Sequence, residues 1–512
     1  MKNFFTGIAC IIALLFSVTV SAQPVPSVRE EKDIAYYTAH APFTMPAVPL
    51  PKFNEKIFSI ADYGAVNDGK TLCTEAFAKA IEACSKAGGG RVLVPSGIWL
   101  TGPIELKSNI DLHTEKNALI QFTTDHTQYP IINMNGDGKT FVVASPVYAY
   151  KANNIAITGE GTFDGAGESW RPVKKNKVTA VAWDELKKTG VVSEDGKIWW
   201  PTFDAMKGED YVKNLKEKKD VTDKDYLPAR DFLRPYMVYF IQCKTILMQG
   251  VTIRNSPKFV FYPNRCTDLT INGVSVFNEW WAQNGDGIDI SACKNVVIYN
   301  TALSVGDDGI CMKSSRGSNA ADEAQLKNIL IANCVVYRAH GGFVIGSNTD
   351  GGMQNIYVAD CNFIGSDIGI RVKSNPGRGG LVKNIYIDNI KMKDIKNEAI
   401  LFTTYYEDMP AGKTASNNNG EAADDKIPHF TEFHISNITC EGAATAISIT
   451  GLPGTPVDKI YFDNINITAK KGFVSTDAAD IFLNKITLNT DKPLYKMKSS
   501  VNVLLDGKPV EE

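Results

Sequence analysis

Three copies of one pattern decide the fold of this chain: NILIANCVV at residues 328–336, NIYVADCNF at 355–363 and NIYIDNIKM at 384–392. Each copy opens on Asn, continues with alternating apolar and β-branched residues, is interrupted by Asn or Asp, and then resumes. Alternation over so few residues, with polar interruptions, is typical of short strands and turns rather than helices.

The same pattern extends well beyond these three copies. Its first residues, the anchors, are Asn154, Thr245, Asp268, Asn295, Asn328, Asn355, Asn384, Glu432 and Lys459. From Asp268 to Asn384 the intervals between anchors are 27, 33, 27 and 29 residues. Such a period, with several short strands in each copy, predicts an all-β chain folded as a parallel β-helix, in which each turn of the solenoid stacks on the last. Adjacent strands lie about 4.8 Å apart, so residues at equal phase in successive turns become neighbours. We find no hairpin or blade signature that favours a sandwich or a propeller.

The irregular parts of the pattern define the domain organisation. The Lys- and Trp-rich stretch at about 168–234, with Trp170, Trp183, Trp199 and Trp200, is predicted to be a large inserted loop region that projects from the solenoid. Residues from Thr74 to Gly88 show helical spacing and a glycine stop, which predicts an N-terminal helix that caps the open end. We therefore expect an N-terminal extension at 23–55, a parallel β-helix domain at 56–497 and a C-terminal tail at 498–512.

The first 22 residues, MKNFFTGIACIIALLFSVTVSA, read as a secretory signal peptide, because a short apolar run is followed by a small-residue cleavage site. No later stretch is apolar enough to span a bilayer. The formal net charge of −3 argues against a general polyanion binder. We expect an exported protein, periplasmic or extracellular, that is monomeric, does not insert into membranes and binds no nucleic acid.

Nine cysteines follow the signal peptide, and none has metal-ligand spacing. They are interpreted as small apolar side chains stacked inside the repeats, with a disulfide between neighbouring turns left open as an alternative.

Acidic motifs fall on consecutive repeats, as NGDGID at 284–289 and GDD at 306–308. Asp286 and Asp307 are 21 residues apart, about one turn, so Asp286, Asp307 and Asp308 are expected on one wall. Hydrolysis of a glycosidic bond needs one carboxylic acid and one carboxylate, and clustered carboxylates raise one another's pKa. A single Asp in a solenoid is more often a turn former than a catalytic group.

Three further charged residues have phases close to those of the Asp residues, though not identical to them. His340 lies 33 residues after Asp307, and Arg371 and Lys373 follow 31 and 33 residues after His340. Residues i and i+2 of a strand share a face, so both cations point the same way. Each residue alone has an ordinary structural explanation, but their combination predicts a hydrolase site for an acidic polymer.

The motifs NGDGID, GDD, AHGG at 339–342 and RVK at 371–373 resemble the four-motif signature of glycoside hydrolase family 28, the polygalacturonases. The resemblance covers roughly residues 58–497. It implies a right-handed parallel β-helix that hydrolyses α-1,4-galacturonosyl bonds of pectin with inversion and without a metal or other cofactor. The departures at Gly285, Ala339, Gly342 and Val372 remove no charged group.

By this resemblance Asp307 is the general acid, and Asp286 and Asp308 hold and deprotonate the attacking water. His340 supports the protonation state of the acid.

The same resemblance assigns Arg371, Lys373 and, less specifically, Tyr406 to substrate binding. Charge-assisted contacts of this kind suit the carboxylates of uronic acids.

The large insertion predicts exo action from the non-reducing end, because a wall at one end of the groove admits only a chain terminus. The alternatives are a rhamnogalacturonan or branched-pectin hydrolase or an endo-acting enzyme of the same family. Outside the family they are a calcium-dependent pectate lyase and a non-catalytic polysaccharide-binding solenoid.

Overall fold

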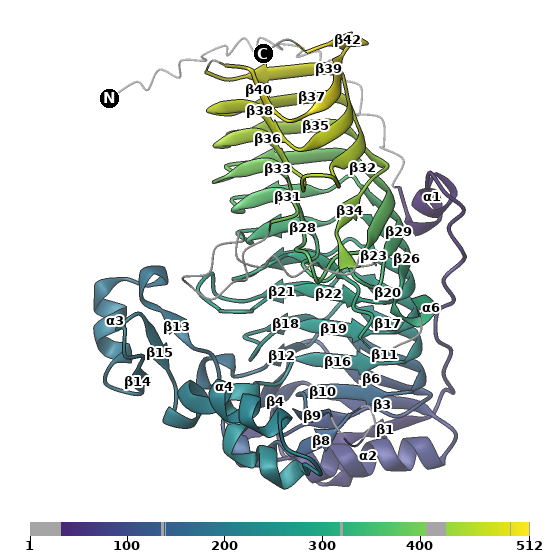
Figure 1. Cartoon of the computed structure of the whole chain (residues 1–512). Helices are drawn as coiled ribbons and strands as arrows, with labels where there is room; N and C mark the ends of the chain where they lie inside the picture. The colour runs from purple at the N-terminus through teal and green to yellow at the C-terminus, as the bar shows by residue number, and fades with distance from the viewer. Residues whose placement is uncertain are drawn as a thin grey trace, which may run out of the picture.

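A computed structural model describes residues 32–134, 138, 140–317, 321–405, 426–491 and 493–510 of the chain. Figure 1 shows a tall stack of coils that runs from the N-terminal region at the bottom to the C-terminal region at the top. The predicted parallel β-helix is confirmed, because successive strands of the stack pair in parallel over nearly its whole length.

Each central coil contributes a long strand, a short strand and a third strand on another wall. The long strands belong to a 25-stranded sheet and include β17 (Lys244–Gln249), β20 (Thr267–Asn272), β23 (Lys294–Tyr299), β26 (Leu326–Ala332), β29 (Met353–Ala359), β32 (Leu381–Lys393), β35 (Phe433–Glu441), β37 (Val457–Thr468) and β39 (Ala478–Asn489). The short strands of the same sheet include β18 (Thr252–Arg254), β21 (Ser275–Phe277), β24 (Ala302–Ser304), β27 (Val335–Tyr337) and β30 (Asn362–Ile364).

The third wall is a 12-stranded sheet. In order along the stack it contains β5 (Ile104–Glu105), β10 (Val147–Tyr150), β16 (Val238–Ile241), β19 (Phe261–Asn264), β22 (Ile288–Ser291), β25 (Ile310–Lys313), β28 (Gly341–Ile345), β31 (Ile368–Lys373), β33 (Glu398–Thr403), β36 (Thr445–Thr450), β38 (Lys471–Thr476) and β40 (Tyr495–Lys498). The sheets enclose one continuous core of Ile, Val, Leu, Phe and Cys side chains.

The anchors of the repeat have one backbone conformation in common. All nine have a φ between 52° and 60°, the left-handed region. Asn and Asp adopt this region more readily than other non-glycine residues, which explains their prevalence at this phase. Their side chains also form a ladder: the Asn328 amide donates to Asn295 Oδ1 at 3.0 Å, and the Asn355 amide donates to Asn328 Oδ1 at 3.0 Å.

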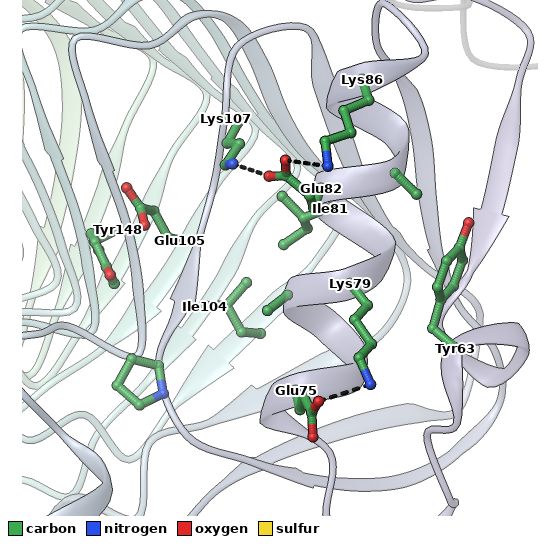
Figure 2. Close-up of a pocket in the computed structure, with 13 residues that line it drawn as sticks. Tyr63, Glu75, Lys79, Ile81, Glu82, Lys86, Ile104, Glu105, Lys107 and Tyr148 are labelled. Carbon is green, nitrogen blue, oxygen red and sulfur yellow. Dashed lines mark hydrogen bonds and ion pairs between the residues drawn. The ribbon is translucent and has the colours of Figure 1, made fainter.

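The predicted capping helix is α2 (Thr74–Lys86), which lies across the bottom of the stack in Figure 1. Its buried residues Phe77 and Ile81 join the solenoid core and cover the first coil. Figure 2 shows a pocket of about 770 Å³ between this helix and Lys107, lined by the ion-paired Glu82 and Glu75. None of its lining residues belongs to the acidic motifs.

The N-terminal extension crosses the outside of the stack before the first coil (Figure 1). Its helix α1 (Ile34–Ala39) packs Tyr37 against Leu330 and Tyr357 of the long strands. The Tyr37 hydroxyl donates to Asp360 Oδ2 at 2.6 Å, and Lys32 Nζ lies 2.8 Å from the same oxygen. The extension is therefore anchored at mid-height of the solenoid.

The insertion at 168–234 folds as a subdomain rather than as a loop. It contains the antiparallel strands β13 (Val173–Lys174), β14 (Val191–Val192) and β15 (Ile198–Trp200), the helices α3 (Ala180–Leu186), α4 (Phe203–Lys216) and α5 (Arg230–Leu233), and the short 3-10 turn η4 (Lys175–Lys177). Trp183 and Trp199 are buried with Val173 in its own core, which explains the concentration of Trp. In Figure 1 this subdomain projects sideways from the lower half of the stack.

The C-terminal boundary predicted at residue 497 is too early. Residues assigned to a tail form β41 (Val501–Leu505), which pairs in parallel with β39 and extends the solenoid by a further strand. β42 (Lys508–Pro509) then folds back antiparallel on β41. The sequence pattern ends earlier because these strands are short and largely exposed.

All nine cysteines after the signal peptide are buried and free, as expected for small core side chains. Cys243, Cys266 and Cys293 stack on successive coils. The residue after each cysteine shows this, because Lys244 pairs with Thr267 and Thr267 pairs with Lys294. Within the described residues, no helix is long and apolar enough to cross a membrane.

Candidate active site

The three predicted carboxyl groups lie just before two neighbouring strands of the 12-stranded sheet. Ile288 of β22 pairs with Ile310 of β25, and Asp286 and Asp308 each lie two residues earlier. One carboxylate oxygen from each of Asp286, Asp307 and Asp308 lies within 4.8 Å of the other two. The repeat phase therefore placed these groups on one wall correctly.

The three carboxyls differ in their access to solvent. The side chain of Asp307 is 21 % exposed, whereas those of Asp286 and Asp308 are 5 % and 2 % exposed. Asp307 is thus the member of the cluster that is most accessible from solvent.

Asp308 is held by the two cations of β31. Lys373 Nζ lies 2.7 Å from Asp308 Oδ2, and Arg371 Nη1 donates to Oδ1 at 3.3 Å. Burial opposes ionisation of this carboxyl, but the charges of Lys373 and Arg371 outweigh burial and hold the pKa of Asp308 below its ordinary value. Arg371 and Lys373 are brought to the cluster as predicted, and both contact the carboxylate of Asp308.

A second lysine, Lys313, lies on the opposite side of the cluster, beside Asp286 and Asp289. Its Nζ lies 2.8 Å from Asp289 Oδ1 and 3.7 Å from Asp286 Oδ2. Burial raises the pKa of Asp289 to about 6 despite this lysine. Lys313 was not among the predicted site residues, yet Cys311-Met-Lys313 has the same phase in β25 as Arg371-Val-Lys373 in β31.

Asp286 is the carboxyl whose pKa is raised most clearly. Burial is the main cause, and the negative charges of Asp289 and Asp307 add to it. Among the described residues, Oδ1 of Asp286 accepts no hydrogen bond. Burial and these neighbouring charges therefore make Asp286 harder to ionise than an exposed carboxyl.

His340 stands one coil above Asp307 in the same column. Its backbone N–H donates to Asp307 O at 2.8 Å, and its Nδ1 lies 3.0 Å from Asp307 Oδ1. Burial raises the pKa of Asp307, but the hydrogen bond from His340 and nearby positive charge, including that of Lys373, together outweigh burial and leave this pKa below its ordinary value. The next residue of the column is Asp367, whose Oδ2 lies 3.7 Å from His340 Nε2.

The insertion also reaches this site. Lys177 Nζ of η4 lies 2.8 Å from His340 Nε2. The buried Arg171 forms an ion pair with Glu279 at 2.7 Å, and Arg234 Nη2 donates to Asn284 Oδ1 at 2.9 Å. Both ends of the insertion therefore hold the segment that leads into Asp286.

No repeat pattern marks Lys177, Arg171 or Arg234, and this is why sequence reasoning missed them. The remaining predicted site residue, Tyr406, lies outside the described residues.

The arrangement suits acid–base hydrolysis of a glycosidic bond, since carboxyls of different protonation state meet in one buried cluster. Their oxygen spacing of 4.8 Å or less is shorter than the roughly 6.5–9.5 Å between carboxyl groups that is typical of inverting enzymes. The spacing by itself does not favour inversion.

Comparison with known proteins gives one consistent result. The sequence profile of Glycosyl hydrolases family 28 matches residues 211–483, more than half of the chain. The chain is 28 % identical to an exo-poly-alpha-D-galacturonosidase of Dickeya chrysanthemi over 89 % of this chain and 75 % of that protein. It is 23 % identical to an endo-polygalacturonase of Pectobacterium parmentieri, over 78 % and 85 % of the two chains. The solved structure of an exopolygalacturonase from Thermotoga maritima is similar with a TM-score of 0.66 and 27 % identity, over 88 % of this chain and 94 % of that one.

Proposed function

The chain belongs to glycosyl hydrolases family 28, and on that premise we propose that it is an exported polygalacturonase that hydrolyses α-1,4-galacturonosyl bonds of pectin. The observation that carries this proposal is the cluster of Asp286, Asp307 and Asp308, in which Lys373 and Arg371 keep one carboxyl ionised. A glycoside hydrolase needs such a division between a protonated and an ionised carboxyl.

Asp307 is the proposed general acid, because a group that protonates the leaving oxygen must contact substrate and Asp307 is the exposed carboxyl. Asp286 and Asp308 are the proposed holders of the attacking water. The low pKa of Asp308 keeps it ionised, which is the state that a base requires, and Asp286 Oδ1 accepts no hydrogen bond from the described residues. In this assignment the substrate, by excluding water from Asp307, raises its affinity for a proton.

Inversion rests on family membership and not on the carboxyl spacing. It requires that water attacks from the face opposite to Asp307 while the leaving oxygen takes the proton. We therefore treat Asp286 and Asp308 as the pair that holds this water, with Asp308 as its base.

Binding of galacturonate carboxylates is assigned to Arg371, Lys373 and Tyr406. Arg371 supports this role because its side chain is 14 % exposed and extends beside the cluster. Lys373 is 5 % exposed, so its main contribution is to Asp308. The same cationic group attracts an acidic polymer from solution.

Exo action from the non-reducing end is supported by the insertion. Lys177 places this subdomain in contact with His340, and Arg171 and Arg234 fix both of its ends beside the first acidic motif. A folded obstacle at that point blocks one end of a groove that an endo-acting enzyme keeps open. The relative from Dickeya chrysanthemi, whose similarity covers 89 % of this chain, is named an exo-poly-alpha-D-galacturonosidase.

A calcium-dependent lyase is disfavoured by the chemistry of the carboxyls. Ca²⁺ takes six to eight oxygen ligands, whereas Asp308 is engaged by Lys373 and Arg371, and Asp289 by Lys313. A donor set already neutralised by cations does not suit a divalent ion.

The testing experiment is digestion of defined oligogalacturonides and of rhamnogalacturonan fragments, followed by product analysis over time. We expect galacturonic acid as the dominant product from the first time points, an inverted anomer in the initial NMR spectrum, and full activity with chelator. An early ladder of oligomers contradicts exo action, unsaturated products contradict hydrolysis, and turnover confined to rhamnogalacturonan contradicts the substrate.

Export is proposed from the signal peptide alone, to the periplasm or beyond the cell. Mass spectrometry of the mature protein is expected to find Gln23 at its N-terminus. A mature chain that retains residues 1–22 contradicts export by this route.

A further inference from the structure

Lys177 is the residue of the insertion that touches the candidate active site. It ends the short turn η4, and its Nζ lies 5.4 Å above the ring of Trp280, in the segment between β21 and β22. The side chain is partly buried, and burial lowers the pKa of Lys177, although Asp307 and Asp367 oppose this effect. The contact with His340 thus has one partner on the subdomain and one on the solenoid.

The two contacts of the His340 ring define which nitrogen carries a proton. Asp307 Oδ1 also accepts the backbone N–H of Asp308 at 3.0 Å, so this oxygen is an acceptor and the His340 Nδ1 at 3.0 Å from it must be the donor. A lysine ammonium has only donors, so the Nε2 at 2.8 Å from Lys177 must be the acceptor. Both requirements are met only by a neutral imidazole with its proton on Nδ1.

Other charged groups around the ring compete for the same nitrogen. Asp367 Oδ2 lies 3.7 Å from His340 Nε2 and would accept a hydrogen bond from a protonated Nε2. Lys396 Nζ lies 2.7 Å from the other oxygen of Asp367 and holds that carboxylate in place. Lys177 and Asp367 therefore have opposite effects on His340: Lys177 favours an unprotonated Nε2, and Asp367 favours the imidazolium.

We infer that Lys177 is a positioning residue that keeps His340 neutral with its proton on Nδ1, so that no imidazolium forms beside Asp307. An imidazolium in contact with Asp307 would stabilise the carboxylate and deprive the acid of the proton that it must deliver. Neutral His340 still orients Asp307 but adds no positive charge at that contact. The kinetic consequence rests on the proposed function, whereas the protonation of His340 does not.

The experiment is ¹⁵N NMR of the histidine side chains in the unliganded full-length protein. The chain has six histidines, so a His340→Asn variant assigns the signal of interest. In the wild type we expect a protonated Nδ1 and an unprotonated Nε2 near neutral pH. In Lys177→Met we expect Nε2 of His340 to gain a proton, while Lys177→Arg, which retains a donor, keeps the wild-type pattern.

Lys175→Met is the matched control, because Lys175 lies in the same turn and its side chain is exposed. It is expected to leave the signals of His340 unchanged. His113 and His126 form side-chain hydrogen bonds elsewhere in the fold, with Thr158 and Asp231, so their signals report whether each variant is folded.

Kinetics separate positioning from substrate binding. Lys177→Met is expected to lower kcat on the order of tenfold with KM within about twofold, because the acid is weakened and binding is retained. A protonated Nε2 in the wild type, or an unprotonated one in Lys177→Met, overturns the inference. A rise in KM at unchanged kcat also overturns it, since Lys177 would then bind substrate. If the tautomer is as expected but no pectic substrate is hydrolysed, only the proposed function fails.

Discussion

Lys373 Nζ lies 2.7 Å from Asp308 Oδ2. Lys373 is in β31 and Asp308 lies just before β25, and one strand of the sheet, β28, lies between these two strands. Both side chains are at most 5 % exposed, so each depends on the other for its charge. This buried pair sets the ionised member of the carboxyl cluster. It also joins coils of the solenoid across the proposed active site.

Lys373→Met is expected to lower kcat by about a hundredfold or more, because burial then raises the pKa of Asp308 and weakens it as a base. Loss of one partner from a buried ion pair costs about 3–5 kcal/mol, and the remaining Arg371 reduces this amount. Activity assays and chemical unfolding measure the two effects. Lys393→Met, the same change at an exposed lysine of β32, is the control, and equal losses in both variants contradict a specific role.

Asp307→Asn and Asp286→Asn are expected to differ in their response to the leaving group. An aryl galacturonide with an acidic phenol leaves without protonation, so Asp307→Asn retains most of its activity on this substrate and loses about 10²–10⁴-fold on oligogalacturonides. Asp286→Asn loses activity on both substrates, because the attacking water is affected. The reverse pattern would make Asp286 the acid, in agreement with its raised pKa.

The attachment of the N-terminal extension is expected to weaken in acid. Burial raises the pKa of Asp360, but hydrogen bonds from Lys32, Tyr37 and Asn389 outweigh it and lower this pKa. A lowered folded pKa contributes stability that is present above the unfolded value of about 3.9 and is lost as the pH falls through the folded value. The hydrogen-exchange protection factors of α1, taken relative to intrinsic exchange at each pH, should therefore fall below about pH 4 in the wild type. In Asp360→Asn they should be low at neutral pH already, and a pH-independent wild type contradicts the prediction.

The ladder of anchors is expected to contribute to stability through both backbone and side chain. Asn328→Ala removes hydrogen bonds to Asn295 and Asn355 and keeps a side chain at a φ of 60°, so we expect a loss of about 1–3 kcal/mol. Asn328→Gly removes the same bonds but tolerates the backbone, and should lose about 1 kcal/mol less. Denaturant midpoints compare the two variants, and an Ala variant as stable as the Gly variant contradicts the backbone argument.

The fold was predictable because its rule is local and repeated. An Asn such as Asn328 marks a left-handed bend, alternation marks the strands on either side, and the interval gives the coil. The same rule stacked Asp286, Asp308 and His340 correctly, since equal phase becomes proximity in a parallel sheet. It failed at residue 497, where β41 is too short and too exposed to show the pattern.

The parts of the site that were missed depend on contacts that no period describes. Lys177 reaches His340 only because a separately folded subdomain docks beside the groove. The raised pKa of Asp286 likewise depends on burial and on the charge of Asp289. Asp289 is part of the first acidic motif, but the spacing of the motif does not show which of its carboxyls is buried. Lys313 was detectable by its phase with Lys373, although no acidic motif pointed to it.

The proposed catalytic groups all come from four consecutive strands of one sheet, β22, β25, β28 and β31, or from the segments just before them. Their relative heights are consequently set by the register of that sheet, and the coils above β33 form a stem in which the described residues include none of the proposed catalytic groups. Duplication of a coil in that stem would lengthen the molecule and leave the catalytic groups in register. Deletion of one coil between β22 and β31 would place the wrong pair of proposed catalytic groups next to each other. The number of coils can therefore change at the top of the stack without disturbing these groups, but not between these two strands.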